Sequence, residues 1–515
     1  MPKRPKLFDY EPVTRPHGTS SGGNEERGSI ATSAAPPLQN DPPRNPVAEI
    51  NPFQLRDTAA RSDVWQQKEA DQVGSPTKKT RAPSQHWNLK RGHGLSYIGL
   101  FLFTLVVYVR PYELWPSLAW TSTSAFWIAI LTLLAFIPAQ LGLENRITAD
   151  LREVNLLLLL SLLGILSVVL SIDRLEAWNT FVVFIKIVIM FIVMVNVVRT
   201  EGRLKGLLLL SLLVSLVISV GAINDFRMGR LKLGGVRIGG VLAGLFENPN
   251  DMALHLVTMI PIALAMMLGS RGPVRKTFYV VCALLMFGAV IVSFSRGGFL
   301  GLAAAAVVMA WKLRKRSRAG VFGVSLAALI LFVVFLPSGY TNRLESMYNR
   351  DLDTGSVASR QDLLFRSLHV AARHPLLGIG MGNFHYVSIH EQVSHNAYTQ
   401  IGAEIGLVAM TIYILFMIAP LKRMRAVQEE TGEAARPSRF YYLAIGLQAS
   451  LIGYMVSSFF ASVAYNWYVY YLVGYAVCLE RIYATTKARD EKTVPVASVA
   501  SRLSTETNTG IIEGV

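Results

Sequence analysis

Charged residues are scarce in this chain, making up 16% of its 515 positions. Soluble domains carry about 25% charged residues. The deficit arises because much of the chain consists of apolar runs long enough to cross a bilayer, which takes about 20 residues each. The composition therefore excludes an ordinary soluble protein and predicts a polytopic membrane protein.

Cysteine is also scarce, since Cys282 and Cys478 are the only two and both lie inside apolar runs. They cannot form a disulfide framework. Histidines gather between positions 369 and 395, but their spacing matches no compact set of metal ligands and no cluster of carboxylates accompanies them. We therefore expect neither a bound metal nor another cofactor.

Residues 1–94 lack a sustained apolar run and are rich in Pro, Ser, Thr, Asn, Gln and charged residues. Such a segment buries too little apolar surface to offset its ordering entropy. It also lacks the short apolar core of a signal peptide. We expect 1–94 to be a disordered cytoplasmic extension and 481–515 to be a disordered cytoplasmic tail.

The remaining sequence divides into about twelve apolar runs. Backbone polar groups in a bilayer must be satisfied internally, which predicts helices, and the alternating pattern of a membrane barrel is absent. The expected fold is an all-α, polytopic bundle of about 12 transmembrane helices. Helices 1–9 are expected within 95–336, the ninth of them near 319–336. A long helical extracytoplasmic (periplasmic) loop is expected at 337–396. Helices 10–12 are expected within 397–480, the tenth as one span at about 397–419.

Lys and Arg predict the orientation of the bundle. Five alternate loops each hold between two and five of them, whereas several opposite loops hold one or none. The positive-inside rule then places both termini in the cytoplasm. Because topology accounts for much of the net charge of +16, nucleic acid is not an expected partner.

Two loops on the expected outer side break this pattern, because 224–250 carries four basic residues and 337–396 carries five. Arg296 adds another cation at the same side. Binding of a diphosphate at the membrane surface explains such cations. Contact with the anionic head groups of membrane lipids is the alternative.

Arg296 belongs to the run Ser-Phe-Ser-Arg-Gly-Gly, which joins two apolar runs with almost no loop. Gly297 and Gly298 would permit a tight reversal and a close approach of backbones. Arg296 is expected near the outer membrane face, either turned inward toward a ligand or snorkelling at the interface.

Residues 359–373 have the pattern of an amphipathic helix. Leu363, Leu364, Ser367, Leu368 and Ala371 share its apolar face, and Arg360 projects onto that same face. A cation that points toward the protein body requires a partner, so Arg360 is the candidate for binding a phosphate. Arg366, His369 and Arg373 lie on the opposite, polar face and are expected to be solvated or to face lipid head groups.

Beyond this helix, a Pro and three alternating glycines predict an irregular turn, and Ser-His-Asn-Ala-Tyr then opens the next apolar run. His395 would lie at the outer end of that run. Histidine titrates near neutral pH, so His395 is a candidate base for an attacking hydroxyl. A structural role at the interface is the alternative.

Three segments in this order resemble the O-antigen ligase and O-antigen polymerase family of bacterial envelope glycosyltransferases. They are FENPNDMA, which holds Asn248 and Asn250; SFSRGGFLGL around Arg296; and the stretch from Arg360 through HPLLGIGMGNF to SHNAYTQIGAEIGLVA. The resemblance covers about residues 95–480 in topology, and its motifs lie between about 237 and 410. The N-terminal extension departs from the family pattern.

The resemblance implies metal-independent transfer of a glycan from an undecaprenyl-diphosphate carrier, at the outer face of the bacterial inner membrane. The acceptor is a hydroxyl of lipid A–core or of another lipid-linked repeat unit. By the resemblance, Arg296 and Arg360 would hold the diphosphate and His395 would be the base, with inversion at the anomeric carbon. Arg237 is a further arginine candidate, and the supporting loop residues would be Asn248, Asn250, Gly297, Gly298 and Asn396.

A carrier or flippase that moves a lipid-linked or acidic sugar without covalent chemistry is the alternative function. Lys186, within an apolar run, would suit it because intramembrane cations often mark transport paths. A carrier, however, places its site near the midplane of the bilayer. The candidate residues gather instead on one expected side, which favours a transferase.

Overall fold

The apolar runs form helices, because a segment inside a bilayer must satisfy its own backbone hydrogen bonds. The computed structural model describes residues 92–111, 116–230, 238–240, 246, 248–314, 356–388, 391–432 and 438–493. Within these ranges there is no strand, and the predicted all-α class is confirmed. Of the two segments expected to be disordered, 1–94 is described only from residue 92 and 481–515 only to residue 493. Residues 481–493 continue helix α19, so the expectation of disorder was wrong for them, and the rest of both segments lies outside the described ranges.

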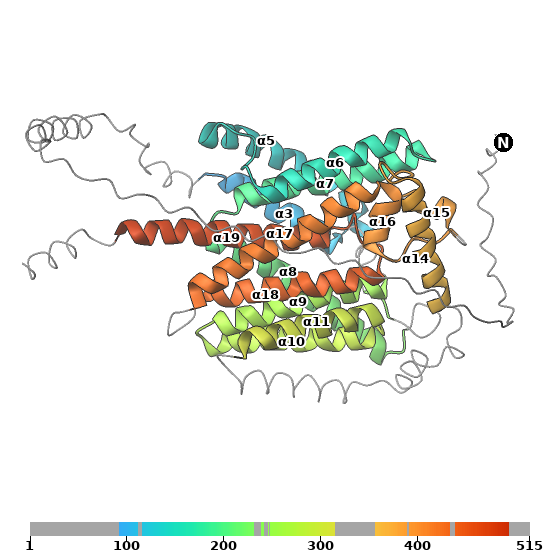
Figure 1. Cartoon of the computed structure of the whole chain (residues 1–515). Coiled ribbons are helices and arrows are strands. Elements are labelled where there is room, and N and C mark those ends of the chain that lie inside the picture. The colour runs from blue at the N-terminus through green and yellow to red at the C-terminus, as the bar shows by residue number, and fades with distance from the viewer. Residues whose placement is uncertain are drawn as a thin grey trace, which may run out of the picture. The chain divides into compact units, whose positions relative to one another are not determined.

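The helices are drawn in Figure 1. In chain order they are α3 (Gly94–Val109), η1 (Pro116–Thr123), α5 (Ser124–Glu144), α6 (Arg152–Val169), α7 (Arg174–Val197), α8 (Glu201–Arg227), α9 (Pro249–Gly269), α10 (Pro273–Val292), α11 (Arg296–Leu313), α14 (Ser356–Arg373), α15 (Phe384–Val387), α16 (Ala397–Glu404), α17 (Leu407–Gly432), α18 (Arg439–Ser457), η4 (Ser458–Phe460) and α19 (Trp467–Thr493).

Among the described residues, nine helices are long and apolar enough to cross a membrane: α5 to α11, α17, and α18 continued through η4. Helix α3 is apolar but has 16 residues, and α19 has 27 residues without belonging to these nine. The span expected near 319–336 lies outside the described residues. The chain is thus a multi-pass membrane protein, and the count of twelve spans stays a prediction.

The run expected to form one span from 397 to 419 is divided into α16 and α17. Gly406, between them, has a φ of 110°, which L side chains rarely adopt. A Cβ atom at this position would lie 2.5 Å from the carbonyl oxygen of Leu376. The expectation of one continuous helix was wrong because the chain must bend around this backbone contact.

Helix α18 lies at the centre of one half of the bundle, where it packs against α9, α11, α17 and α19 (Figure 1). Small residues allow the backbones to approach closely, as is common between membrane helices. A Cβ atom at Gly446 would lie 2.8 Å from the carbonyl oxygen of Pro261 in α9, and one at Gly453 would lie 3.1 Å from that of Gly301 in α11.

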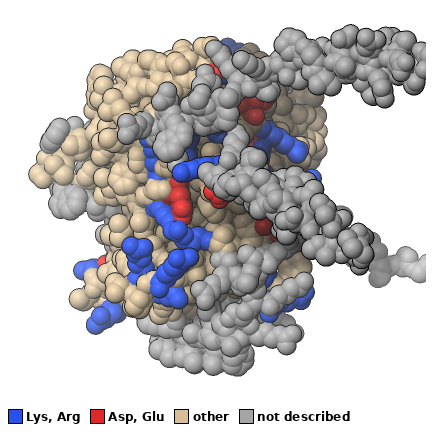
Figure 2. Space-filling view, turned by 90° about the vertical axis from the view of Figure 1, so that its left-hand side faces the viewer, with Lys and Arg blue, Asp and Glu red and all other residues tan. Residues whose placement is uncertain are grey.

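These helices define the two ends of the bundle. The Arg296 end holds the N-termini of α9 and α11 together with the C-terminus of α18, and α14, α15 and α16 gather there, at the right of Figure 1. The Arg439 end holds the C-terminus of α9 and the N-termini of α10 and α18. Figure 2 faces the Arg439 end, where Lys and Arg side chains gather with Asp and Glu side chains among them.

One ion-pair network at the Arg439 end joins three helices. The carboxylate of Glu153 in α6 is fully buried and accepts hydrogen bonds from Nε and Nη2 of Arg423 in α17, at 2.8 and 3.0 Å. Nη1 of Arg423 donates to Glu480 of α19 at 3.0 Å. Because a buried carboxylate is costly without a cation, Arg423 fixes how α6, α17 and α19 meet.

We expect Arg423→Ala to lower the free energy of unfolding by on the order of 3 kcal/mol, because the change leaves Glu153 buried without its cation. Thermal unfolding of the purified chain in detergent measures this loss. The matched control is Arg425→Ala, which removes a cation two residues away in an exposed i,i+4 pair with Glu429 and should cost about 0.3–0.5 kcal/mol. Equal losses in the two variants would contradict the structural role given to Arg423.

Candidate functional site

The N-termini of α9 and α11 are joined by their capping residues. Oδ1 of Asn248, the N-cap of α9, accepts a hydrogen bond from the N–H of Asn250 at 2.9 Å. Oγ of Ser295, the N-cap of α11, accepts from the N–H of Gly298 at 3.2 Å and donates to Oδ1 of Asn250 at 3.0 Å. Two of the predicted motifs are therefore in contact, and Arg296 stands half-buried at the first position of α11.

The reversal before Arg296 does not use the glycines, so that part of the sequence interpretation was wrong. Phe294, with a φ of 52°, provides the left-handed residue at the turn. The expected close approach is present, because a Cβ atom at Gly297 would lie 2.8 Å from Cβ of Phe460. A Cβ atom at Gly298 would lie 2.8 Å from Cβ of Ala253 in α9. The glycines thus seat α11 against its neighbours.

Helix α14 begins at Ser356, three residues earlier than expected. It packs against α16, and its buried face is rotated slightly from the predicted one. Leu368 is 44% exposed, whereas Val370 is fully buried, since the packed face is narrower than the apolar pattern suggested. Buried residues of this face are Leu363, Ser367, Val370 and Ala371.

Arg360 lies half-buried on this face, and the structure brings it beside His395. Burial of the His395 imidazole and then the positive charge of Arg360 lower the pKa of that histidine. His395 is therefore neutral, and able to accept a proton, down to a lower pH than an ordinary histidine. Nε of Arg366, by contrast, donates to the carbonyl of Val387.

The glycine-rich turn between α14 and α15 is tied to the end of α16. Gly378, Gly380 and Gly382 have φ values of 63°, 105° and 77°, as the predicted irregular turn requires. The N–H of Gly380 donates to the carbonyl oxygen of Glu404 at 2.9 Å, and that of Gly382 donates to Oε2 of Glu404 at 2.9 Å. The hydroxyl of Tyr465 donates to the same carboxylate at 2.7 Å. This anchoring holds α14 in place beside α16.

One segment, residues 458–466, contacts both the backbone of His395 and the start of α11. The N–H of His395, whose φ is 51°, donates to Oγ of Ser462 at 2.8 Å. Asn396 then caps α16 by accepting from the N–H groups of Tyr398 and Thr399. Ser462 follows η4, whose Phe460 packs on Gly297. The 458–466 connection thus lies between the start of α11 and His395.

Sequence reasoning missed Ser462 and Ser295. Both are small polar residues in short connections, and Ser462 lies in a connection without charge, so its type and spacing carried no signal. Arg237 lies outside the described residues. Within the described ranges there is no group of three or more His, Cys, Asp or Glu residues placed to hold a metal.

We expect Arg360→Gln to raise the pKa of His395 toward its ordinary value of about 6.5, because the change removes a nearby positive charge. The rise is partial, since burial, the larger cause, remains. Diethyl pyrocarbonate modifies only neutral imidazole, so the pH midpoint of modification at His395, followed by peptide mass spectrometry, should move upward. Arg366→Gln, on the same helix, is the control and should not move it. An unchanged midpoint in Arg360→Gln would show that the two side chains do not interact.

A comparison with known protein families gives a match that includes three of the candidate site residues. Residues 281–414 match the family described as O-antigen ligase, a segment that runs from α10 to the first part of α17 and contains Arg296, Arg360 and His395. No curated protein matches the chain. Asn248, Asn250 and Ser462 lie outside the matched segment. The chain is thus a multi-pass membrane protein in which residues 281–414 are similar to the O-antigen ligase family.

Proposed function

We propose that the chain is a glycosyltransferase that moves a glycan from an undecaprenyl-diphosphate carrier to an acceptor hydroxyl, either of lipid A–core or of another lipid-linked repeat unit. The observation that carries the proposal is the placement of the Arg360 guanidinium beside the imidazole of His395, within the segment that matches the O-antigen ligase family. A candidate anion-binding group thereby lies close enough to a candidate base for its charge to act on that base.

Arg360 and Arg296 hold the diphosphate in this proposal. A guanidinium offers a planar fork of donors that matches phosphate oxygens and keeps its charge when partly buried. Arg296 stands at the N-terminus of α11, where the helix dipole adds to the attraction for an anion. Arg237 is kept as a third candidate from the loop before α9. Asn248, Asn250, Gly297 and Gly298 support Arg296, and Asn396 supports His395.

In this proposal the reaction balances with these groups alone and uses no metal or other cofactor. The acceptor oxygen forms a bond to the anomeric carbon of the donor glycan while its proton passes to the neutral imidazole of His395. The bond between the anomeric carbon and the phosphate oxygen breaks, and undecaprenyl diphosphate leaves with its negative charge held by the arginines. Fixed cations stabilise such a leaving group. In-line attack inverts the anomeric centre.

The proposed setting is the inner membrane of a bacterium, with both termini in the cytoplasm and the Arg296 end at the outer face. The donor and the acceptor are then lipid-anchored molecules that reach the site from the membrane. The basic side chains at the Arg439 end fit this orientation by the positive-inside rule (Figure 2).

A carrier without covalent chemistry is the alternative, and the position of Lys186 argues against it. Lys186 lies on an exposed face of α7 and does not line the interior of the bundle. Cations that mark transport paths face the interior or a water-filled cavity. The candidate base and the candidate anion-binding arginines gather instead at one end, which favours transfer.

We expect Arg360→Lys and His395→Ala each to abolish most glycan transfer in proteoliposomes supplied with lipid-linked donor and acceptor. The lysine fails because a point charge cannot replace the two-pronged donor. Loss of a general base costs typically 10²–10⁴-fold. The His395→Ala variant should still bind the donor.

The matched controls are Arg366→Ala and His369→Ala, which change the same residue types on α14 and should cost no more than about a few-fold. Full activity of His395→Ala would remove this base from the mechanism. Full activity of Arg360→Lys would show that a two-pronged donor is not needed at this position. Equal losses in the controls would show that α14 acts through its fold and not through Arg360.

A further inference from the structure

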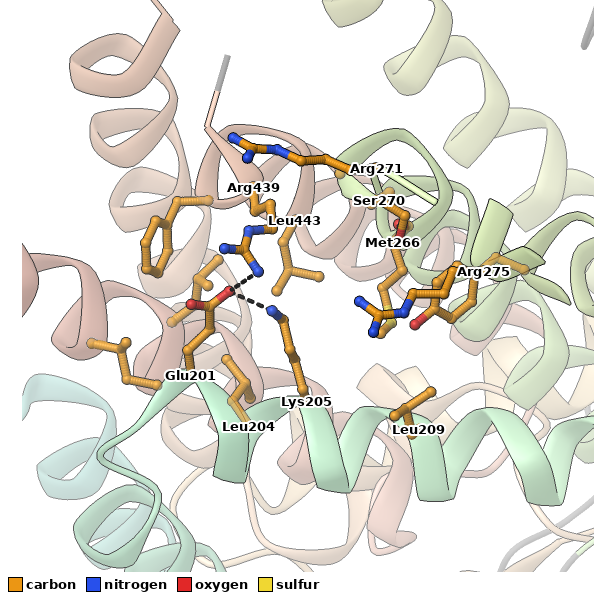
Figure 3. Close-up of a pocket in the computed structure, with 16 residues that line it drawn as sticks. Glu201, Leu204, Lys205, Leu209, Met266, Ser270, Arg271, Arg275, Arg439 and Leu443 are labelled. Atoms are coloured by element: carbon orange, nitrogen blue, oxygen red, sulfur yellow. Dashed lines mark hydrogen bonds and ion pairs between the residues drawn. The ribbon is translucent and has the colours of Figure 1, made fainter. Parts of the chain in front are cut away.

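A cavity of about 390 Å³ lies at the Arg439 end, far from the candidate site. Its volume falls within the roughly 300–1,000 Å³ of small-molecule sites. Residues from the start of α8, the end of α9, the starts of α10 and α18, and the middle of α19 line it (Figure 3). Helix α9, about 30 Å long by its 21 residues, separates this cavity from Asn250.

The cavity is strongly positive. Four of its lining residues are basic and only Glu201 is acidic: the basic ones are Lys205, Arg271, Arg275 and Arg439. Glu201 is shared, since its Oε1 lies 2.5 Å from Nζ of Lys205 and 3.4 Å from Nη1 of Arg439. Among the described residues, neither Arg271 nor Arg275 has an ion pair with a carboxylate.

One of these cations extends into the cavity without a carboxylate partner among the described residues. Figure 3 shows the guanidinium of Arg275, from α10, reaching toward the open centre of the cavity, whereas the ammonium of Lys205, from α8, turns toward Glu201. Because the single carboxylate of Glu201 is shared by Lys205 and Arg439, the cavity keeps a surplus of positive charge that attracts an anion. The arginine forks favour an oxyanion with several acceptors, such as a phosphate.

The wall changes from charged to apolar along the helices. Glu201 and Lys205 stand in the first turns of α8, and Leu209 lies about 12 Å further along the axis than Glu201. Leu204, Met266, Leu443, Leu479 and Ile482 complete the apolar wall. A cavity with a cationic mouth at the helix ends and an apolar wall running into the bundle fits an amphiphile with an anionic head.

We propose that this cavity binds the phosphate head group of an anionic phospholipid, in the leaflet opposite the candidate site. The phosphate lies between Lys205 and Arg275, Arg271 and Arg439 flank it, and the first part of an acyl chain follows Leu209 and Met266. Basic pockets between transmembrane helices are suited to such head groups. The proposal does not depend on glycosyl transfer at the Arg296 end.

The test is native mass spectrometry of the full chain in detergent, titrated with phosphatidylglycerol. Lys205→Gln/Arg275→Gln should weaken binding by about tenfold or more, since each basic residue near a head group contributes on the order of 1 kcal/mol. The matched control, Arg152→Gln/Lys276→Gln, removes two cations that do not line the cavity, one of them adjacent to Arg275. It should change binding less than about twofold by the same reasoning.

Leu209→Trp tests the apolar wall without changing its charge. It should also weaken lipid binding, because the larger ring occupies the space proposed for the acyl chain. If Lys205→Gln/Arg275→Gln does not fold, Arg271→Gln, at an exposed position, replaces it as the test variant. Arg271→Gln should weaken lipid binding more than Lys276→Gln does.

Four results would overturn the proposal: equal binding of zwitterionic phosphatidylethanolamine; equal losses in the control pair; unchanged binding in Leu209→Trp; or displacement of the lipid by equimolar glycerol 3-phosphate, which would show a site for a water-soluble anion.

Discussion

The close seating of α11 against α9 and α18 is the constraint on which the candidate site depends. Gly297 and Gly298 leave no room for a Cβ atom against Phe460 and Ala253. Phe460 therefore lies directly on the start of α11, and the connection that follows it reaches the backbone of His395 through Ser462. A larger residue at Gly297 would push away the same segment that contacts the backbone of His395, so the glycines beside Arg296 also affect the position of that histidine.

Sequence patterns predicted the helices well because membrane spans are defined by long apolar runs, which are local features. The direction in which Arg360 projects also followed from local periodicity, and the structure brings Arg360 beside His395. Bonds between distant segments could not be predicted in this way. The hydrogen bond from Ser295 to Asn250 and that from His395 to Ser462 join residues 45 and 67 positions apart. The break at Gly406 depends on the backbone of Leu376, a contact that no periodicity records.

Positive charge serves two purposes in this molecule. The basic residues at the Arg439 end were interpreted from the sequence as determinants of topology, and the positive-inside rule accounts for their number. It does not account for their convergence on one cavity with a single carboxylate, which only the packing of five helices reveals. At the Arg296 end, Arg296 stands where α11 begins, and Arg360 lies half-buried on the helix that packs against α16. The anion-binding groups proposed at the two ends thus differ in kind: a site with a candidate base at one end, and a cavity with an apolar wall at the other.

The central claim, that this chain makes and breaks covalent bonds at the Arg296 end, is tested most directly by the fate of the carrier. Wild-type protein in proteoliposomes, given a lipid-linked glycan and an acceptor, should release one undecaprenyl diphosphate for each glycan joined to the acceptor. Quantifying both products by mass spectrometry gives that ratio. Donor that crosses from one leaflet to the other with its glycan still attached, and no glycosylated acceptor, would contradict the account and establish a carrier.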